Sequence, residues 1–236
     1  MKKKKIKNIL NQTVRPQIKD LGYDPNDFFV CGGCIVSMLN DEPVNDFDVY
    51  CKKDNINEDM VANLWANSED NDVVSNTGNA ITLKSKIQFI TKFGGKPREV
   101  VENFDFLHTK TFYDFQSDEL YLPSEVKEVI KRKILVYTGS AYPVSSLLRI
   151  PKYIKRGWVI GAVDHMKIVM DTNALDLIND SNVLKDQLMG VDLGDFFNDQ
   201  GEIDTNLATG LSRFKYVEPN NTIPPDEPVH WEENMK

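Results

Sequence analysis

The sequence is poor in the features that mark membrane and secreted proteins. No apolar run in its 236 residues approaches the ~20 residues that a membrane-spanning helix needs. The lysine run Lys2–Lys5 is not followed by the apolar segment of a secretory signal. The 3 cysteines cannot all pair with one another, and so low a number fits a reducing compartment. We therefore expect a cytoplasmic protein with no membrane partner.

Cysteine and histidine are also scarce as potential zinc ligands. Cys31 and Cys34 have the spacing of a zinc or redox pair, but the sequence contains no second cysteine pair. The 3 histidines, His108, His165 and His230, are scattered along the chain. Zinc is therefore the weaker interpretation of the cysteine pair, and we expect His108 to be a structural residue.

Basic residues are scarce in the last third of the chain. Of 28 Lys+Arg and 36 Asp+Glu, residues 161–236 hold 5 and 15, a net charge of −10. Residues 1–160 hold the other 23 and 21, a net charge of +2. A protein that binds tRNA needs several Lys or Arg contacts to phosphates, so tRNA is possible but disfavoured as a partner.

The run Lys2–Lys5 is either a nucleic-acid patch or a solvated, frayed terminus, and the second interpretation is favoured. The abundant lysine and asparagine, with little alanine, suggest an AT-rich, phage-like genome.

The most informative stretch runs from Phe28 to Cys51. It predicts a strand, a glycine turn, a short helix, a polar loop and a second strand, at Phe28–Val30, Gly32-Gly33, Ile35–Leu39, Asn40–Asn45 and Asp46–Cys51. Residues two apart on a strand share a face, so Asp46 and Asp48 are expected on the same side of the sheet. Two carboxylates placed in this way suit Mg²⁺, which binds carboxylates together with substrate phosphates. The glycine pair lets the backbone approach a phosphate, and the helix after it offers free N–H groups. The alternative is a strand end with solvated aspartates.

Taken together, these features resemble the nucleotidyltransferase fold of the DNA polymerase β superfamily. The most similar branch is the head domain of class II tRNA nucleotidyltransferases and bacterial poly(A) polymerases. That family has Gly-Gly-x-Val-Arg-Asp, a leucine-rich helix and Asp-x-Asp. With Gly32-Gly33 on its glycines, Asp46 and Asp48 fall on its aspartates without a gap. The family's Arg-Asp falls on Val36-Ser37, so a phosphate-contacting arginine is missing here.

The resemblance continues in Asn103–Phe115. The family has an Arg-Arg-Asp-Phe-Thr stretch that ends in Ala-Tyr-Asp, whereas this chain has Asn-Phe-Asp-Phe-Leu and ends in Phe112-Tyr113-Asp114 at equal spacing. The two arginines are lost, and Asp105 falls on the family's aspartate. We predict that Asp105 lies on a strand beside that of Asp46 and Asp48. In the wider superfamily such a carboxylate completes the metal site and helps to deprotonate the attacking hydroxyl. The alternative for Asp105 is a turn former at a strand end.

The segment Ser145–Trp158 resembles the family's neck, where an arginine-rich helix faces the nucleotide. Arg149, Lys152 and Arg156 recur at three- and four-residue steps, which predicts one shared helix face. Cations on that face are expected to hold a triphosphate, and the alternative is a solvated basic face. Pro151 predicts a kink, or a helix that starts near it.

Elsewhere the apolar spacing predicts further elements. The helices are Ile6–Leu21 (interrupted at Pro16), Asn57–Trp65, Pro97–Asn103, Ser124–Lys133 and much of 163–215, and the strands are Ala80–Leu83, Lys86–Phe93, Leu120–Leu122 and Ile134–Tyr137. The predicted fold class is α/β (α+β), a small mixed sheet with flanking helices followed by a helical C-terminal part. The predicted divisions are an N-terminal helix (1–27), a nucleotidyltransferase head (28–140), a helical neck (141–216) and a proline-rich acidic tail (217–236) that is expected to be extended.

The resemblance implies a metal-dependent nucleotidyltransferase that moves an NMP from an NTP to a hydroxyl acceptor and releases pyrophosphate. It implies two Mg²⁺ ions held by Asp46, Asp48 and Asp105, the last also activating the hydroxyl, and a triphosphate seated by Gly32, Gly33, Arg149, Lys152 and Arg156. The acceptor stays open between a protein, a small molecule and RNA. The missing arginines motivate an alternative, a catalytically degenerate protein that binds a nucleotide or a partner. A third interpretation is nucleic-acid binding through Lys2–Lys5 and the Arg149 face.

Overall fold

The computed structural model describes residues 2–66, 72–76, 79–175, 183 and 186–188. The contacts divide the chain into Met1–Val191 and Asp192–Lys236, and the whole second unit lies outside the described residues. The predicted tail 217–236, and nearly all of the predicted helical segment beyond residue 175, therefore lie outside them.

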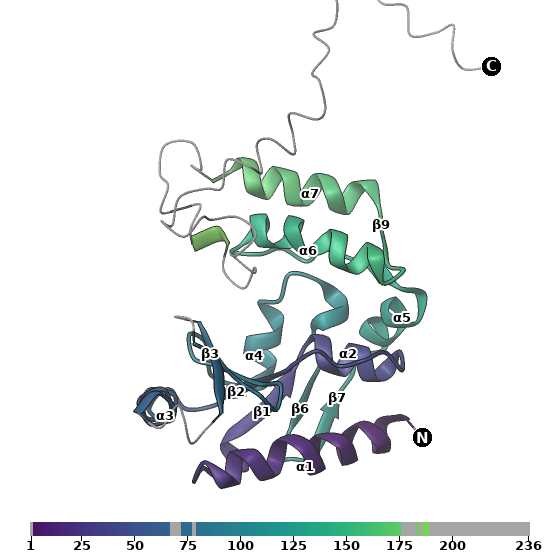
Figure 1. The fold of residues 1–236 in the computed structure, drawn as a ribbon. Helices are drawn as coiled ribbons and strands as arrows, with labels where there is room; N and C mark the ends of the chain where they lie inside the picture. The colour runs from purple at the N-terminus through teal and green to yellow at the C-terminus, as the bar shows by residue number, and fades with distance from the viewer. Residues whose placement is uncertain (1, 67–71, 77–78, 176–182, 184–185, 189–236) are drawn as a thin grey trace, which may run out of the picture. The chain divides into compact units, whose positions relative to one another are not determined.

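Seven strands form one mixed sheet between helices (Figure 1). Their order is β3-β4-β5-β2-β1-β6-β7, in which β2 and β5 are parallel and the other neighbours are antiparallel. The strands are β1 Phe28–Cys31, β2 Phe47–Cys51, β3 Val73–Asn76, β4 Ala80–Leu83, β5 Ile87–Ile90, β6 Phe112–Asp114 and β7 Glu119–Tyr121. The predicted fold class, a mixed sheet with flanking helices, is confirmed.

One face of the sheet is covered by helix α1 (Lys2–Asp20), as Figure 1 shows. Its four buried residues, Ile6, Leu10, Val14 and Ile18, recur every four positions and so line one side of the helix. They share a core with apolar side chains of β1 and β2. This burial of a continuous apolar stripe holds the helix on the sheet.

Two predictions for α1 are wrong. Pro16 lies inside the helix and does not interrupt it, and the lysine run forms the first turn of the helix rather than a frayed end. The side chain of Lys2 donates to the carbonyl of Leu39 at 2.9 Å and pairs with Asp41 at 2.7 Å. Lys2 thereby caps the end of another helix, α2 (Gly33–Leu39).

The opposite face carries a second group of helices. They are α4 (Pro97–Glu102), α5 (Ser124–Arg132), α6 (Pro143–Lys155) and α7 (Ala162–Asn173). Strand β8 (Ile134–Leu135) follows α5 and strand β9 (Val159–Ile160) follows α6, and the two strands pair in parallel. Val100 and Val101 of α4 pack on Phe29 and Cys31 of β1. Figure 1 shows α6 beyond α4, so α6 lies on the side of the sheet away from α1.

Most predicted elements are present with shifted ends, but strands β3 and β9 were not predicted. Strand β3 has mostly exposed residues, so its sequence gives little of the alternation that marks a strand. Helix α3 runs over Asp54–Ala66. Short 3₁₀ turns, η1 (Pro25–Asp27) and η2 (Leu107–Thr109), complete the described elements.

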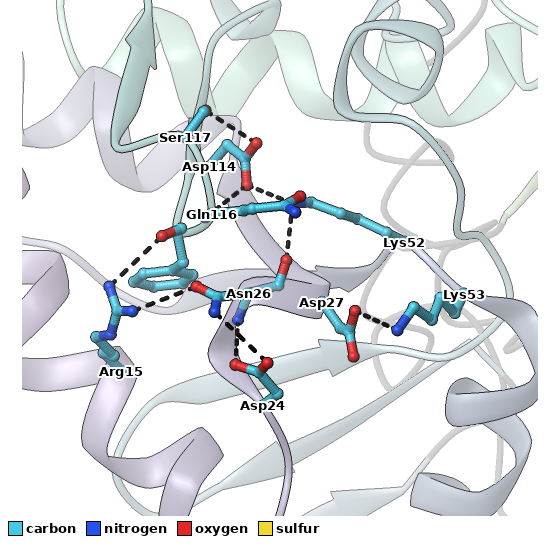
Figure 2. A network of polar contacts seen from close by, with 10 residues as sticks. Arg15, Asp24, Asn26, Asp27, Lys52, Lys53, Asp114, Gln116 and Ser117 are labelled. Atoms are coloured by element: carbon cyan, nitrogen blue, oxygen red, sulfur yellow. Dashed lines mark hydrogen bonds and ion pairs between the residues drawn. The ribbon is translucent and has the colours of Figure 1, made fainter.

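The end of β2 remote from Asp46 is fixed by a polar network (Figure 2). The Lys52 ammonium lies 2.5 Å from Asp114 and donates to the carbonyl of Asn26 at 2.8 Å. Arg15 of α1 reaches the side chain of Asn26 at 3.4 Å. Because these residues come from α1, η1, β6 and the position directly after β2, the network ties the N-terminal helix to the strand ends. Asp114, the last residue of the Phe-Tyr-Asp match, is thus occupied in a structural ion pair.

Among the described helices, none combines the length and the apolar character that crossing a membrane requires.

Candidate active site

The glycine turn joins β1 to α2 by a backbone shape that only glycine adopts readily. Gly32 is the N-cap of α2 and has φ 77° and ψ −137°. A Cβ atom at Gly32 would lie 3.5 Å from the Phe104 ring and 3.9 Å from Oδ2 of Asp48. The same atom on Gly33 would meet nothing within 4 Å. The turn therefore presents Gly32 to the carboxylate of Asp48 and leaves Gly33 open.

Asp48 lies on β2, and Asp46 immediately precedes that strand. Phe47, Val49 and Cys51 point into the core under α1, so Asp48 and Tyr50 lie on the opposite face of the sheet. Burial and then the negative charge of Asp46 raise the pKa of Asp48 to about 7, while Lys152 and Arg149 act to lower it. The structure thus brings Asp46, Asp48 and two cations of α6 together.

Cys31 and Cys34 both lie close enough to Asp48 for its charge to act on their thiols. Both thiols are buried and free. Burial, followed by the charge of Asp48, raises the pKa of each thiol well above its ordinary value. Since the thiolate is the form that binds metals and attacks disulfides, neither sulfur is poised for such chemistry.

Asp105 is not on a strand, contrary to the prediction. It lies in a bend after α4, and the strands beside β2 are β1 and β5. Its buried carboxylate receives two hydrogen bonds on Oδ2, from Arg149 Nη1 at 2.6 Å and from Ser146 Oγ at 2.9 Å. The backbone N–H of Thr138 donates to the Asp105 carbonyl at 2.8 Å. The aspartate is therefore fixed and neutralised by α6.

The three predicted metal ligands do not form one cluster. In the part of the chain that the structure describes, no group of three or more His, Cys, Asp or Glu side chains is arranged to hold a metal ion. Arg149 interacts with both places, because it binds Asp105 and also opposes the rise in the pKa of Asp48. The structure thus pairs Asp46 with Asp48, and Asp105 is bound by Arg149.

The three cations of the α6 region separate into two groups. Arg149 and Lys152 act on Asp48, whereas Arg156 caps the end of the helix and binds Glu42 at 2.6 Å and Ser37 at 2.7 Å. Lys133 also binds Glu42, at 2.8 Å. Arg149 and Lys152 therefore share a direction toward Asp48, whereas Arg156 is engaged by α2 and the loop after it. That these cations hold a triphosphate stays a prediction. Pro151 lies inside α6 and does not begin it.

Two residues of this region were not predicted. Ser146 lies one helical turn before Arg149, and the three-residue spacing was a signal that both side chains share a face. Glu42 lies in a polar loop, where nothing in the sequence sets it apart from a solvated carboxylate.

His108 is fully buried among aromatic rings. Trp158, Tyr153 and Phe106 have ring centroids 4.2, 4.7 and 5.9 Å from its own. Burial and then the charge of Arg156 lower the pKa of His108 to about 3. Neither ring nitrogen has a hydrogen-bond partner among the described residues. His108 is a neutral core residue, as expected, but its polar atoms are not satisfied there.

Comparison with known proteins places the chain in a family. A model described as "Gabija anti-defense 2 family protein" matches residues 1–133, which is more than half of the chain. The chain belongs to the Gabija anti-defense 2 family. "Gabija anti-defense 2" from Bacillus phage SPbetaL7 is 28% identical over 197 residues, which cover 80% of this chain and 48% of that protein. The chain thus spans about half the length of this curated relative.

Solved structures similar to the chain include two CCA-adding enzymes. The Thermotoga maritima enzyme complexed with tRNA is 14% identical, with a TM-score of 0.49 over 70% of this chain and 44% of that one. The Bacillus stearothermophilus enzyme in complex with CTP is 19% identical, with a TM-score of 0.46 over 67% and 42%.

Proposed function

We propose that this member of the Gabija anti-defense 2 family is a metal-dependent nucleotidyltransferase. The observation that carries the proposal is the pairing of Asp46 with Asp48 against the Gly32 backbone, with Arg149 and Lys152 facing them. Two carboxylates and two cations in one place match a metal–triphosphate, which carries both signs of charge.

The residues present fit a hard divalent cation. Oxygen donors are those that Mg²⁺ prefers, and the charge of Asp46 raises the pKa of Asp48, so the two carboxylates repel each other. A cation between them would remove that repulsion. When bound, it would supply charge stabilisation to the phosphates of the NTP.

The chain's own residues have distinct roles in the proposed reaction. Lys152 and Arg149 bind phosphate oxygens, and the open backbone at Gly33 admits the phosphates close to the turn. An acceptor hydroxyl attacks the α-phosphorus, the bond from that phosphorus to the bridging oxygen breaks, and pyrophosphate leaves. In the free protein Arg149 binds the Asp105 carboxylate. When Arg149 binds the phosphate instead, the Asp105 carboxylate is released and takes the proton of the acceptor hydroxyl.

The description of the family suggests which molecule carries the acceptor hydroxyl. An anti-defense protein is expected to act on a component of the host defence that it counters, here the Gabija system. We propose a hydroxyl of a Gabija protein as the acceptor. Residues 1–160 have a net charge of only +2, which supports a protein acceptor over tRNA.

A second candidate function is a non-catalytic protein that binds a nucleotide or a partner. It is favoured by the contact of Asp105 with Arg149 and Ser146, which leaves that carboxylate neutralised. Valine and serine at positions 36 and 37, where the resembled family has Arg-Asp, point the same way.

A transfer assay tests the proposal. Full-length protein is incubated with each α-³²P-NTP, Mg²⁺ or Mn²⁺, and purified Gabija proteins or bulk tRNA. Label on a Gabija protein that Asp46→Asn abolishes, and that the exposed control Asp20→Asn retains, supports the proposed transferase. Label on tRNA would refute the protein acceptor. No transfer, together with an NTP-dependent rise in melting temperature, would favour the binding protein.

A further inference from the structure

The hydroxyl group of Tyr153, on α6, has no hydrogen-bond partner among the residues that the structure describes. Two other tyrosines do have one: the hydroxyl of Tyr113 donates to Asp118 at 2.7 Å, and that of Tyr137 donates to Asp171 at 2.8 Å. A polar group that folding removes from water normally finds a partner. Tyr153 is partly buried, so its free hydroxyl needs an explanation.

Tyr153 lies on the face of α6 that points toward the candidate site. On the same helix, Ser146 and Arg149 donate to the Asp105 carboxylate at 2.9 and 2.6 Å. Tyr153 follows Arg149 by four residues and Ser146 by seven, so the three side chains share one face of the helix. Arg156 follows by three more residues and binds the loop after α2. Tyr153 therefore lies between the two arginines along this face.

The ring of Tyr153 is held by three other rings. Phe106, His108 and Trp158 lie edge-on to it, with ring centroids 5.7, 4.7 and 5.9 Å away. All three of these side chains are buried, and edge-on contact is a preferred arrangement of aromatic pairs. The hydroxyl therefore has a fixed position before any ligand binds, which lowers the entropy cost of a contact with it.

Charges of the candidate site act on the Tyr153 hydroxyl. Burial and then the charge of Asp105 raise the pKa of Tyr153 well above its ordinary value. Asp48 acts in the same direction, whereas Arg149 and Arg156 act to lower the pKa. The hydroxyl is thus close enough to both carboxylates and to both guanidinium groups to feel their charges. Because its pKa is raised, it stays protonated at neutral pH and remains a hydrogen-bond donor.

We propose that the Tyr153 hydroxyl donates a hydrogen bond to a phosphate oxygen of the bound nucleoside triphosphate, beside the cations Arg149 and Lys152. This inference rests on the proposed function, in which those two cations bind the phosphates. A phosphate oxygen is a strong acceptor, and a neutral hydroxyl binds it without adding a further positive charge next to the arginines. Packing does not account for the hydroxyl, since a phenylalanine ring would make the same edge-on contacts.

The substitution Tyr153→Phe removes only the oxygen atom. A hydrogen bond to a charged acceptor typically changes affinity by about tenfold to a hundredfold, so the Kd for the triphosphate should rise about tenfold or more. The urea midpoint without ligand should stay unchanged, because no hydrogen bond within the described residues is lost. Tyr23→Phe is the matched control. Tyr23 packs on Phe28, with ring centroids 6.1 Å apart, in the core under α1 on the other face of the sheet. Both measurements should be unchanged in this control.

Calorimetric titration of the full-length protein with each NTP and with inorganic tripolyphosphate, in the presence of Mg²⁺, tests the proposal. Tenfold weaker binding of both ligands by Tyr153→Phe, with wild-type stability, supports the contact. Wild-type affinity in the variant would overturn the role of Tyr153 and leave the proposed triphosphate site standing. A loss confined to the NTP would overturn it in favour of a contact with the sugar or the base. A urea midpoint lowered by Tyr153→Phe would overturn it in favour of a structural hydroxyl. A wild-type protein that binds no triphosphate would overturn the proposed function, and the Tyr153 contact with it.

Discussion

The Asp48 carboxyl is expected to destabilise the metal-free protein at neutral pH. Burial and the charge of Asp46 raise its pKa from 3.8 to about 7. The folded protein therefore favours the protonated carboxyl more than the unfolded chain does. The stability that this group contributes is fully present below pH 4 and is lost as the pH rises through about 7. A shift of about three pKa units corresponds to at most ~4 kcal/mol, and partial exposure of the side chain reduces it.

The substitution Asp48→Asn isolates this effect, because an amide cannot ionise. Urea unfolding in EDTA at pH 4.5 and pH 8 gives the free energy of unfolding of both proteins. The free energy of unfolding of the variant minus that of the wild type should be about 1–4 kcal/mol larger at pH 8 than at pH 4.5. Addition of Mg²⁺ at pH 8 should stabilise the wild type and leave the variant unchanged.

Asp114→Asn is the matched control. Although burial acts to raise the pKa of Asp114, its hydrogen bonds to Lys52, to the Gln116 backbone and to Ser117 leave it below the ordinary value. Its ionised form therefore stabilises the fold above pH 4, and the amide should lower stability at pH 8. The reasoning would be refuted if the difference in free energy of unfolding between Asp48→Asn and the wild type were the same at pH 4.5 and at pH 8.

Two further substitutions test the geometry around the site. Gly32→Ala should lower the free energy of unfolding by about 1–3 kcal/mol, because φ 77° with ψ −137° strains any other residue, whereas Gly33→Ala should have little effect. Equal urea midpoints for the two variants would contradict this. Glu42→Gln should cost about 1–3 kcal/mol, because its carboxylate binds Arg156 and Lys133, and the exposed control Glu99→Gln less than 0.5 kcal/mol. If calorimetric melts showed a larger loss of stability for Glu99→Gln than for Glu42→Gln, the ion pairs of Glu42 would not stabilise the fold as expected.

The fold was predictable where a local period matched its burial. The four-residue spacing of Ile6, Leu10, Val14 and Ile18 predicted α1, and the alternation of β2 predicted its two faces. The break at Pro16 was predicted wrongly because packing of the flanking turns outweighs one lost hydrogen bond and the local steric cost. Strand β3 was missed because an edge strand with mostly exposed residues lacks the apolar signal.

The candidate site was predictable only in part, for a related reason. Asp46 and Asp48 are two residues apart, so the strand period alone places them together. The contacts of Asp105 with Ser146 and Arg149 join residues 41 and 44 positions apart, and they depend on how α6 packs over the sheet. Glu42 and Arg156 are 114 positions apart, and no local pattern predicts their ion pair.

The most direct test of the proposed chemistry compares the fate of two labels. Purified full-length protein, Mg²⁺ and the purified Gabija proteins are incubated in parallel with α-³²P-ATP and γ-³²P-ATP, and the other three NTPs follow in the same design. A nucleotidyltransferase leaves the α label on the acceptor and releases the γ label in pyrophosphate, and Asp46→Asn with Asp48→Asn abolishes both events. Transfer of the γ label to protein, or α labelling that the double variant retains, would contradict the assignment of Asp46 and Asp48 as the metal-binding pair of a nucleotidyltransferase.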